Sequence, residues 1–252
     1  KWWIVKLVDR ISCVKDKIDS ALKQCHRSDS VTIVAATKTR NTKAIETCIQ
    51  NGIVDIGENR VQEAEKKFRA VDPGLVYNKR MIGHLQTNKI NKALRTFDTI
   101  DSVDSLRIAK QLVTKNKNNK EKVSVLLEVN TSGDKTKFGF DPDNDQDLLE
   151  CISLDKLFVE GLMTIGPVSQ NKDSTIKAFS LLREIKEKIN RQIEKEKELA
   201  VLSMGMSNDF ELGIFEGSTM VRLGTSLFGP REWKSTKPLG YIIYVRDQKH
   251  GT

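Results

Sequence analysis

Two basic side chains near opposite ends of the chain have the chemistry to act on a carbonyl group. Lys38 ends a short apolar run at 31–38, and Arg222 lies late in another run. Side chains alternate along a strand, so placing Val221 and Leu223 outward leaves Arg222 pointing inward. If the two runs are neighbouring strands, desolvation and the nearby cation would lower the pKa of the lysine. A neutral lysine is a carbonyl nucleophile, whereas a solvated rim lysine remains the alternative.

Two turns rich in small and hydroxyl-bearing residues have the composition of an anion site. They contain Ser207 and the pair Gly224-Thr225. A glycine lets backbone N–H groups approach a phosphate, and the hydroxyls of Ser207 and Thr225 add donors. The alternatives are that Ser207 caps the helix that follows and that Gly224 is a plain turn glycine. Phosphate frequently binds after the seventh and eighth strands of (β/α)8 barrels, and these turns lie at the ends of the seventh and eighth apolar runs.

Eight apolar runs, separated by helical patterns, must position these groups. The runs are 31–38, 54–59, 76–85, 96–102, 123–130, 157–166, 201–207 and 219–224, with helices expected near 42–51, 60–70, 86–95, 104–115, 143–153, 171–198 and 208–216. This alternation predicts a parallel sheet with right-handed crossovers. The first run is not followed by G-x-G-x-x-G, which favours a barrel over an open dinucleotide-binding sheet. An amphipathic helix over 4–26 precedes the first run. One domain spans 1–229, and 230–252 forms a tail without an assigned role.

Length, charge and cysteine usage limit the number of domains, the kinds of partner and the cellular compartment. The 252 residues suit one barrel of about 250. The net charge is +8, but the clearest basic run, 115–120, has no aromatic residue for base stacking, so we expect no nucleic-acid partner. No run approaches the roughly 20 apolar residues of a membrane span. Four cysteines without C-x-x-C spacing argue against a disulfide framework or zinc site and fit the cytoplasm. The start at Lys1, without methionine, leaves a removed targeting segment open.

Seven sequence blocks follow one another in order between residues 31 and 230. They are VAATKT at 34–39, GENRVQE at 57–63, IGHLQTNK at 82–89, NTSG at 130–133 with KFG at 137–139, GLMTI at 161–165, LSMGMS at 202–207 and GSTMVRLGT at 217–225. Together they resemble the pyridoxal phosphate homeostasis proteins, also called proline synthetase co-transcribed homologues. The resemblance covers most of the chain and ends near Arg231. Arg60 stands where the family commonly has tyrosine, and Thr37 replaces a common serine.

The resemblance implies a fold, a cofactor and a site. The family is similar to the barrel domain of alanine racemase, without the second, β-rich domain that supplies racemase catalysis. This similarity implies an α/β protein with a single (β/α)8 barrel that is monomeric or weakly associated. It also implies pyridoxal 5′-phosphate bound as a Schiff base on Lys38, with Arg222 facing the pyridine nitrogen. The other residues implied to bind the cofactor are Ser207, Gly224 and Thr225 at the phosphate, Asn59 and His84 along the pocket, and Ser203 and Met206 beside the phosphate loop.

An arginine at the pyridine nitrogen argues for storage of the cofactor over catalysis. Arginine is a permanent cation without an acceptor, so it donates only to an unprotonated nitrogen and weakens the ring as an electron sink. A second catalytic base is missing too, because Tyr77 falls at the wrong end of its run and Tyr241 and Tyr244 lie in the tail. We therefore predict a carrier or buffer in intracellular vitamin B6 homeostasis that hands the cofactor to apo-enzymes, with weak racemase activity at most. The alternatives are an amino-acid racemase and a phosphosugar aldolase.

Overall fold

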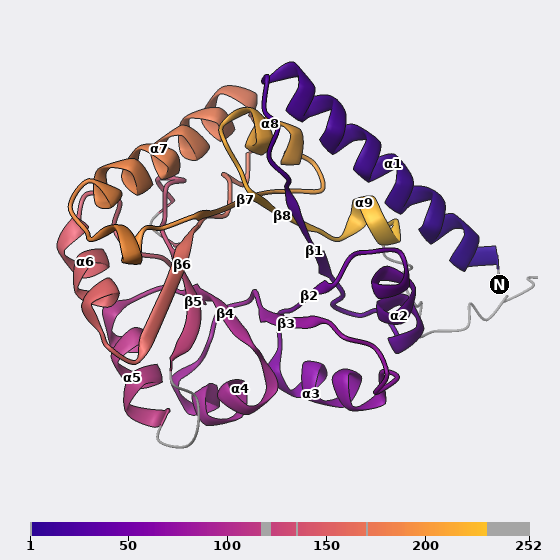
Figure 1. The fold of residues 1–252 in the computed structure, drawn as a ribbon, viewed down its shortest axis with the longest axis horizontal. Helices are drawn as coiled ribbons and strands as arrows, with labels where there is room; N and C mark the ends of the chain where they lie inside the picture. Colours follow the sequence, from indigo (N-terminus) through magenta and orange to yellow (C-terminus); the bar gives the residue numbers. More distant parts are fainter. Residues whose placement is uncertain (1, 117–121, 135, 170, 231–252) are drawn as a thin grey trace, which may run out of the picture.

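Eight parallel strands close into a barrel in chain order, and helices surround it (Figure 1). The computed structural model describes residues 2–116, 122–134, 136–169 and 171–230. The strands are β1 Thr32–Ala36, β2 Asp55–Glu58, β3 Asn78–Met81, β4 Thr99–Val103, β5 Val123–Glu128, β6 Leu157–Met163, β7 Val201–Met206 and β8 Met220–Leu223. The helices are α1 Trp2–Gln24, α2 Thr42–Gln50, α3 Val61–Ala70, α4 Ile90–Thr96, α5 Leu106–Lys115, α6 Asp145–Ser153, α7 Lys172–Asn190, α8 Phe210–Phe215 and α9 Thr225–Phe228.

The predicted (β/α)8 barrel is confirmed, and one strand lies in each apolar run, although β4 extends one residue beyond its run at 96–102. The barrel closes between β1 and β8, where Val34 pairs with Arg222 and Ala35 with Leu223. Lys38 therefore follows the strand that neighbours the strand of Arg222. The basic run beyond Asn116 and the tail at 231–252, with its two tyrosines, lie outside the described residues.

The predicted helices agree with the structure to within two residues at each end, except for two. The helix expected at 171–198 ends at Asn190, because the side chain of Asn190 accepts from the Leu199 N–H at 2.9 Å and donates to the Leu199 carbonyl at 3.1 Å. These bonds fold the chain back toward β7, with one 3₁₀ turn at Lys195–Lys197 between them. The segment expected to be helical at 86–95 begins with a 3₁₀ turn, Thr87–Lys89, before α4.

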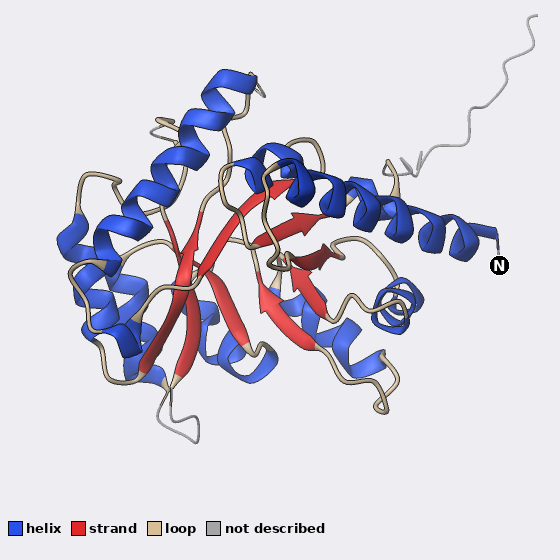
Figure 2. Ribbon diagram, turned by 45° about the horizontal axis from the view of Figure 1, so that its top comes forward, coloured by secondary structure: helices blue, strands red, loops and turns tan. Residues whose placement is uncertain are grey.

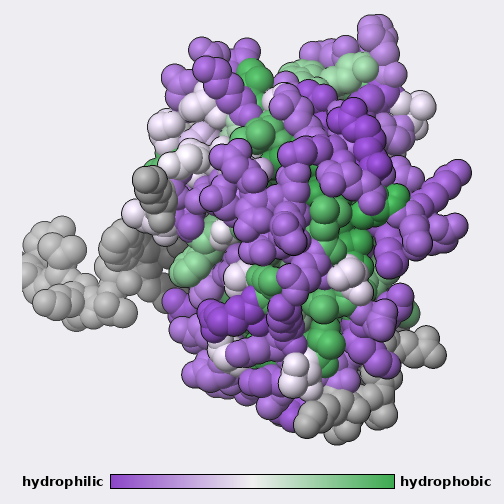
Figure 3. Space-filling model, turned by 90° about the vertical axis from the view of Figure 1, so that its left-hand side faces the viewer, coloured by the Kyte–Doolittle hydropathy of each residue, from purple (hydrophilic) through white to green (hydrophobic). Residues whose placement is uncertain are grey.

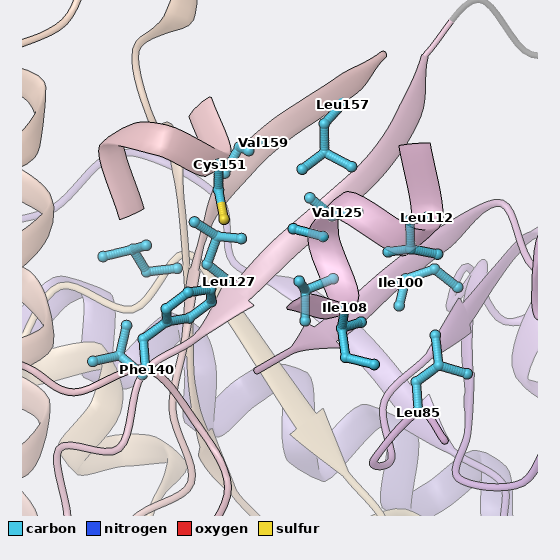
Figure 4. Close-up of a cluster of buried hydrophobic side chains, with 14 of the residues drawn as sticks. Leu85, Ile100, Ile108, Leu112, Val125, Leu127, Phe140, Cys151, Leu157 and Val159 are labelled. Atoms are coloured by element: carbon cyan, nitrogen blue, oxygen red, sulfur yellow. The ribbon is translucent and has the colours of Figure 1, made fainter. Parts of the chain in front are cut away.

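Hydrophobic side chains fill the space between the strands and the outer helices. Leu127 of β5 and Ile108 of α5 belong to the larger of these clusters, which Figure 4 shows in part. A smaller cluster of Val34, Ile82, Leu126, Met163 and Met220 is separate from it. Because side chains alternate along a strand, Leu126 and Leu127 lie on opposite faces, and the smaller cluster fills the barrel interior. The core is thus divided into an inner and an outer layer by the strands.

The interior also contains an ion network centred on Arg80. Its Nε donates to Asp55 Oδ1 at 2.8 Å, its Nη1 donates to Asp101 Oδ1 at 2.9 Å, and its Nη2 lies 3.6 Å from Glu160 Oε2. These carboxylates come from β2, β4 and β6, so one guanidinium links strands across the barrel. Burial raises the pKa of Asp101 to about 6, although Arg80 opposes that shift.

Helix α1 packs outside α2, α8 and α9, where it covers one side of the barrel (Figures 1 and 2). Its buried face carries Leu7, Ile11, Val14 and Ile18 at the predicted helical spacing. Hydrophilic residues dominate the surface in Figure 3, with hydrophobic side chains visible in the gaps between them. None of the described helices combines the length and apolarity needed to cross a bilayer. All four cysteines are free thiols.

Candidate functional site

Lys38 lies at the carboxyl end of the barrel, two residues beyond β1. It lines a cavity of about 690 Å³ together with Asn59, which follows β2, and His84, which follows β3. Three predicted site residues are therefore brought together at the mouth where barrel active sites form. The Lys38 side chain is exposed.

Arg222 is buried beneath the mouth and held in place by its neighbours. Its Nη1 donates to the Ser203 carbonyl at 2.8 Å and to the Ser203 hydroxyl at 2.6 Å, and its Nη2 donates to the Thr164 carbonyl at 2.7 Å. The inward orientation predicted from the alternation in β8 is thus present. Ser203 is fully buried, so in this structure it holds Arg222 instead of lining the cavity.

Glu128 is an acidic group near Arg222 that our sequence reasoning missed. It is the last residue of β5 and is only 7% exposed. Burial raises the pKa of Glu128 to about 7, while the positive charge of Arg222 opposes the shift and Asp104 adds to it. A charged residue that interrupts an apolar run late in a strand was the available signal.

Ser207 and Gly224 meet where β7 and β8 end. The Ser207 hydroxyl oxygen accepts from the backbone N–H groups of Gly224 and Ser226, each at 3.1 Å, and lies 3.1 Å from the Ser226 hydroxyl. Two backbone donors therefore converge on one oxygen at the start of α9. The N-cap of α8 is Asp209, so the interpretation of Ser207 as the cap of that helix is wrong.

Gly224 lies beside the segment that leads to Lys38. A Cβ atom built on Gly224 would be 3.7 Å from the Ala36 carbonyl oxygen, an ordinary contact, and the φ angle of Gly224 is −116°. Neither packing nor backbone geometry within the protein requires glycine there, which is consistent with a ligand approaching the backbone. Thr225 is exposed at the start of α9, and Met206 is 37% exposed at the end of β7.

His84 is fixed at the mouth by two contacts. Its Nδ1 lies 2.8 Å from Asp104 Oδ2, and its ring stacks on Phe138 with centroids 3.7 Å apart and planes 13° from parallel. Asp104 also accepts from the Ser105 hydroxyl at 3.0 Å. Because Nδ1 faces a carboxylate, Nε2 is the atom that can exchange a proton with a ligand. We missed Asp104, although it lies two residues after the fourth run, and Phe138, although it lies in a family block.

The closed barrel and the groups at its mouth define a barrel of the alanine racemase type. The family described as alanine racemase, N-terminal domain, matches residues 15–232. The structure of alanine racemase from Clostridium difficile has the same fold, with a TM-score of 0.68 and 18% identity over 87% of this chain and 61% of that one.

The chain belongs to the family of pyridoxal phosphate homeostasis proteins. It is 37% identical over 228 residues to the member from Aquifex aeolicus, which covers 89% of this chain and 98% of the relative. It is 36% identical to the Vibrio cholerae member over 88% and 95% of the two chains. PipY of Synechococcus elongatus with PLP bound is similar with a TM-score of 0.77 and 30% identity over 88% of this chain and 100% of that one. The names of these relatives state no catalytic activity.

Proposed function

We propose that this chain binds pyridoxal 5′-phosphate as a Schiff base on Lys38 and acts as a reversible carrier in cofactor homeostasis. The observation that carries the proposal is that the segment leading to Lys38 lies against the turn formed by Ser207 and Gly224. Lys38 lies two residues beyond Ala36, and Ala36 lies beside Gly224. The structure of PipY with PLP bound supports the same cofactor for this family member.

The residues at the mouth fit the cofactor. Asn59 Oδ1 is buried and has no hydrogen-bond partner among the described residues, so it is available as an acceptor for a ligand. The Gly224 and Ser226 N–H groups donate to the Ser207 oxygen, which leaves the Ser207 O–H as the donor for a phosphate. When bound, pyridoxal phosphate supplies an aldehyde that condenses with an amine and a ring that withdraws electrons. We assign Lys38 to the aldehyde.

The environment of Arg222 supports storage over catalysis. Two carbonyls and a hydroxyl hold the guanidinium, which cannot accept a proton from a ring nitrogen. The only tyrosine among the described residues, Tyr77, packs edge-on against Phe68 of α3, with ring centroids 5.8 Å apart. It precedes β3, at the opposite end of that strand from the mouth. Among these residues, no tyrosine is placed to act as a second catalytic base.

A racemase is the competing function, because His84 and Asp104 form a pair able to transfer a proton at the mouth. The two proposals differ in turnover. Holoprotein incubated with L-alanine should form no D-alanine at a rate comparable to a metabolic enzyme, yet it should transfer its cofactor to an apo-enzyme that depends on pyridoxal phosphate. Rapid racemisation would contradict the carrier proposal and favour the enzyme.

The binding itself is tested by spectroscopy. The protein mixed with pyridoxal phosphate should show the visible band of a protonated Schiff base, and Lys38→Ala should abolish it. Lys89→Ala is the matched control, because Lys89 lines the same cavity and has no assigned role. Loss of the band in both variants, or persistence of the band in Lys38→Ala, would refute the assignment.

A further inference from the structure

A lysine of α3 lies behind the segment that presents Lys38. The Lys67 ammonium donates to the Thr37 carbonyl at 2.7 Å and lies 2.6 Å from Glu58 Oε1 and 2.7 Å from Glu63 Oε1. An ammonium has three donors, so these three acceptors satisfy all of them. The Lys67 side chain is only 12% exposed, which shields the contacts from water.

The same acceptors hold the backbone on both sides of Lys38. Glu58 Oε1 also accepts from the Thr37 hydroxyl at 2.6 Å, and Glu63 Oε1 accepts from the Thr39 N–H at 2.8 Å. Lys67 therefore connects the residue before Lys38 to the residue after it. We call Lys67, Glu58 and Glu63 the α3 clamp.

The backbone within the clamp has an unfavourable conformation. Thr39 has a φ angle of +65°, in the left-handed region that a β-branched residue rarely adopts. Such a residue costs about 1–3 kcal/mol and persists only where its surroundings enforce it. Two hydrogen bonds hold this bend: the Thr39 N–H donates to Glu63, and the Arg40 N–H donates to the Thr37 carbonyl at 2.9 Å. The bend sets the direction in which the chain leaves Lys38.

If its only role were to stabilise the fold, the α3 clamp would be inefficient. Glu58 is fully buried, burial raises its pKa, and its Oε2 has no hydrogen-bond partner among the described residues. Buried ion pairs are commonly no more stabilising than well-packed hydrophobic residues of similar size. The network buries a charged group and contacts the two residues that flank Lys38. Its role is therefore better explained by the position that it imposes on the Lys38 segment.

We propose that Lys67 is a positioning residue that fixes the orientation of the Lys38 amine in the barrel mouth through the α3 clamp. The proposal rests on the proposed Schiff base at Lys38. Lys67 itself does not line the cavity and acts only through Thr37 and Thr39.

The test compares Lys67→Met with Lys66→Met, an exposed neighbour on the same helix. Titration with pyridoxal phosphate gives the affinity, and visible circular dichroism gives the ellipticity for each bound cofactor. We expect Lys67→Met to raise the Kd at least tenfold and to reduce the ellipticity per bound cofactor by half or more. Lys66→Met should change neither. If Lys67→Met does not fold, Glu58→Gln combined with Lys67→Met removes the ammonium and its buried partner charge together, and the same changes are expected.

The outcomes separate this proposal from the proposed function. An unchanged ellipticity per bound cofactor in Lys67→Met, with or without a lower thermal midpoint, shows a merely structural role and overturns the inference. A Kd within twofold of the Lys66→Met value overturns it as well. A wild-type protein without a Schiff-base band instead refutes the proposed function, and this inference with it.

Discussion

Replacement of Ser207 by alanine should weaken binding of pyridoxal phosphate while leaving pyridoxal unaffected. In the structure, the Ser207 hydroxyl accepts from the Gly224 and Ser226 N–H groups at 3.1 Å. Water can replace this partly buried hydroxyl, so the variant should lose at most about 1 kcal/mol of unfolding free energy. A hydrogen bond from the hydroxyl to a charged phosphate contributes about 1.5–3 kcal/mol. The Kd for pyridoxal phosphate should therefore rise about 10- to 150-fold.

The assay compares two ligands that share an aldehyde and differ in the phosphate. The Kd of each is measured from the visible band in the wild type, in Ser207→Ala and in Ser153→Ala. Ser153 is a suitable control, because it is exposed and its hydroxyl donates only to the Glu150 carbonyl. Pyridoxal affinity should change less than twofold in every variant. Equal losses for the two ligands in Ser207→Ala would refute the placement of the phosphate at this turn.

Two further predictions concern stability. Burial raises the pKa of Glu128 from 4.5 to about 7. The protonated carboxyl therefore contributes its full stabilisation of the fold below pH 4.5, and this contribution is lost as the pH rises through about 7. In urea denaturation without added cofactor, the unfolding free energy of Glu128→Gln should equal that of the wild type at pH 4 and exceed it by about 1–3 kcal/mol at pH 8. A lower unfolding free energy than the wild type at pH 8 would contradict the burial argument. Thr39→Asn should raise the unfolding free energy by about 0.5–1 kcal/mol, because asparagine tolerates a φ of +65° better than threonine does. A lower thermal midpoint in Thr39→Asn would show that Thr39 is not strained.

The barrel could be predicted because its signals are local and repeated. Each apolar run is bounded by polar or glycine residues, and its order along the chain gives the order of strands in a parallel barrel. The inward orientation of Arg222 could be predicted too, because the alternation of side chains in β8 is also a local signal. Strand lengths were less accurate, because β3 occupies only Asn78–Met81 of the run at 76–85.

The contacts between distant residues could not be derived from the sequence pattern. Lys67 looks like any basic residue in the last turn of an amphipathic helix, and its contact with Thr37 spans 30 residues. Ser207 preceded a helix and also followed a strand, so local sequence could not separate a cap from an anion site. The hydrogen bonds of Ser203 depend on the side chain of Arg222 from the next strand. Side-chain partners of this kind emerge only when the strands are assembled.

The central claim is that Lys38 carries the cofactor, and reductive trapping tests it most directly. Holoprotein treated with borohydride, digested and analysed by mass spectrometry should carry one phosphopyridoxyl group per chain, on the peptide that contains Lys38. A modification located on another lysine, such as Lys89 or Lys137 near the mouth, or a protein that retains no group after reduction, would contradict the account.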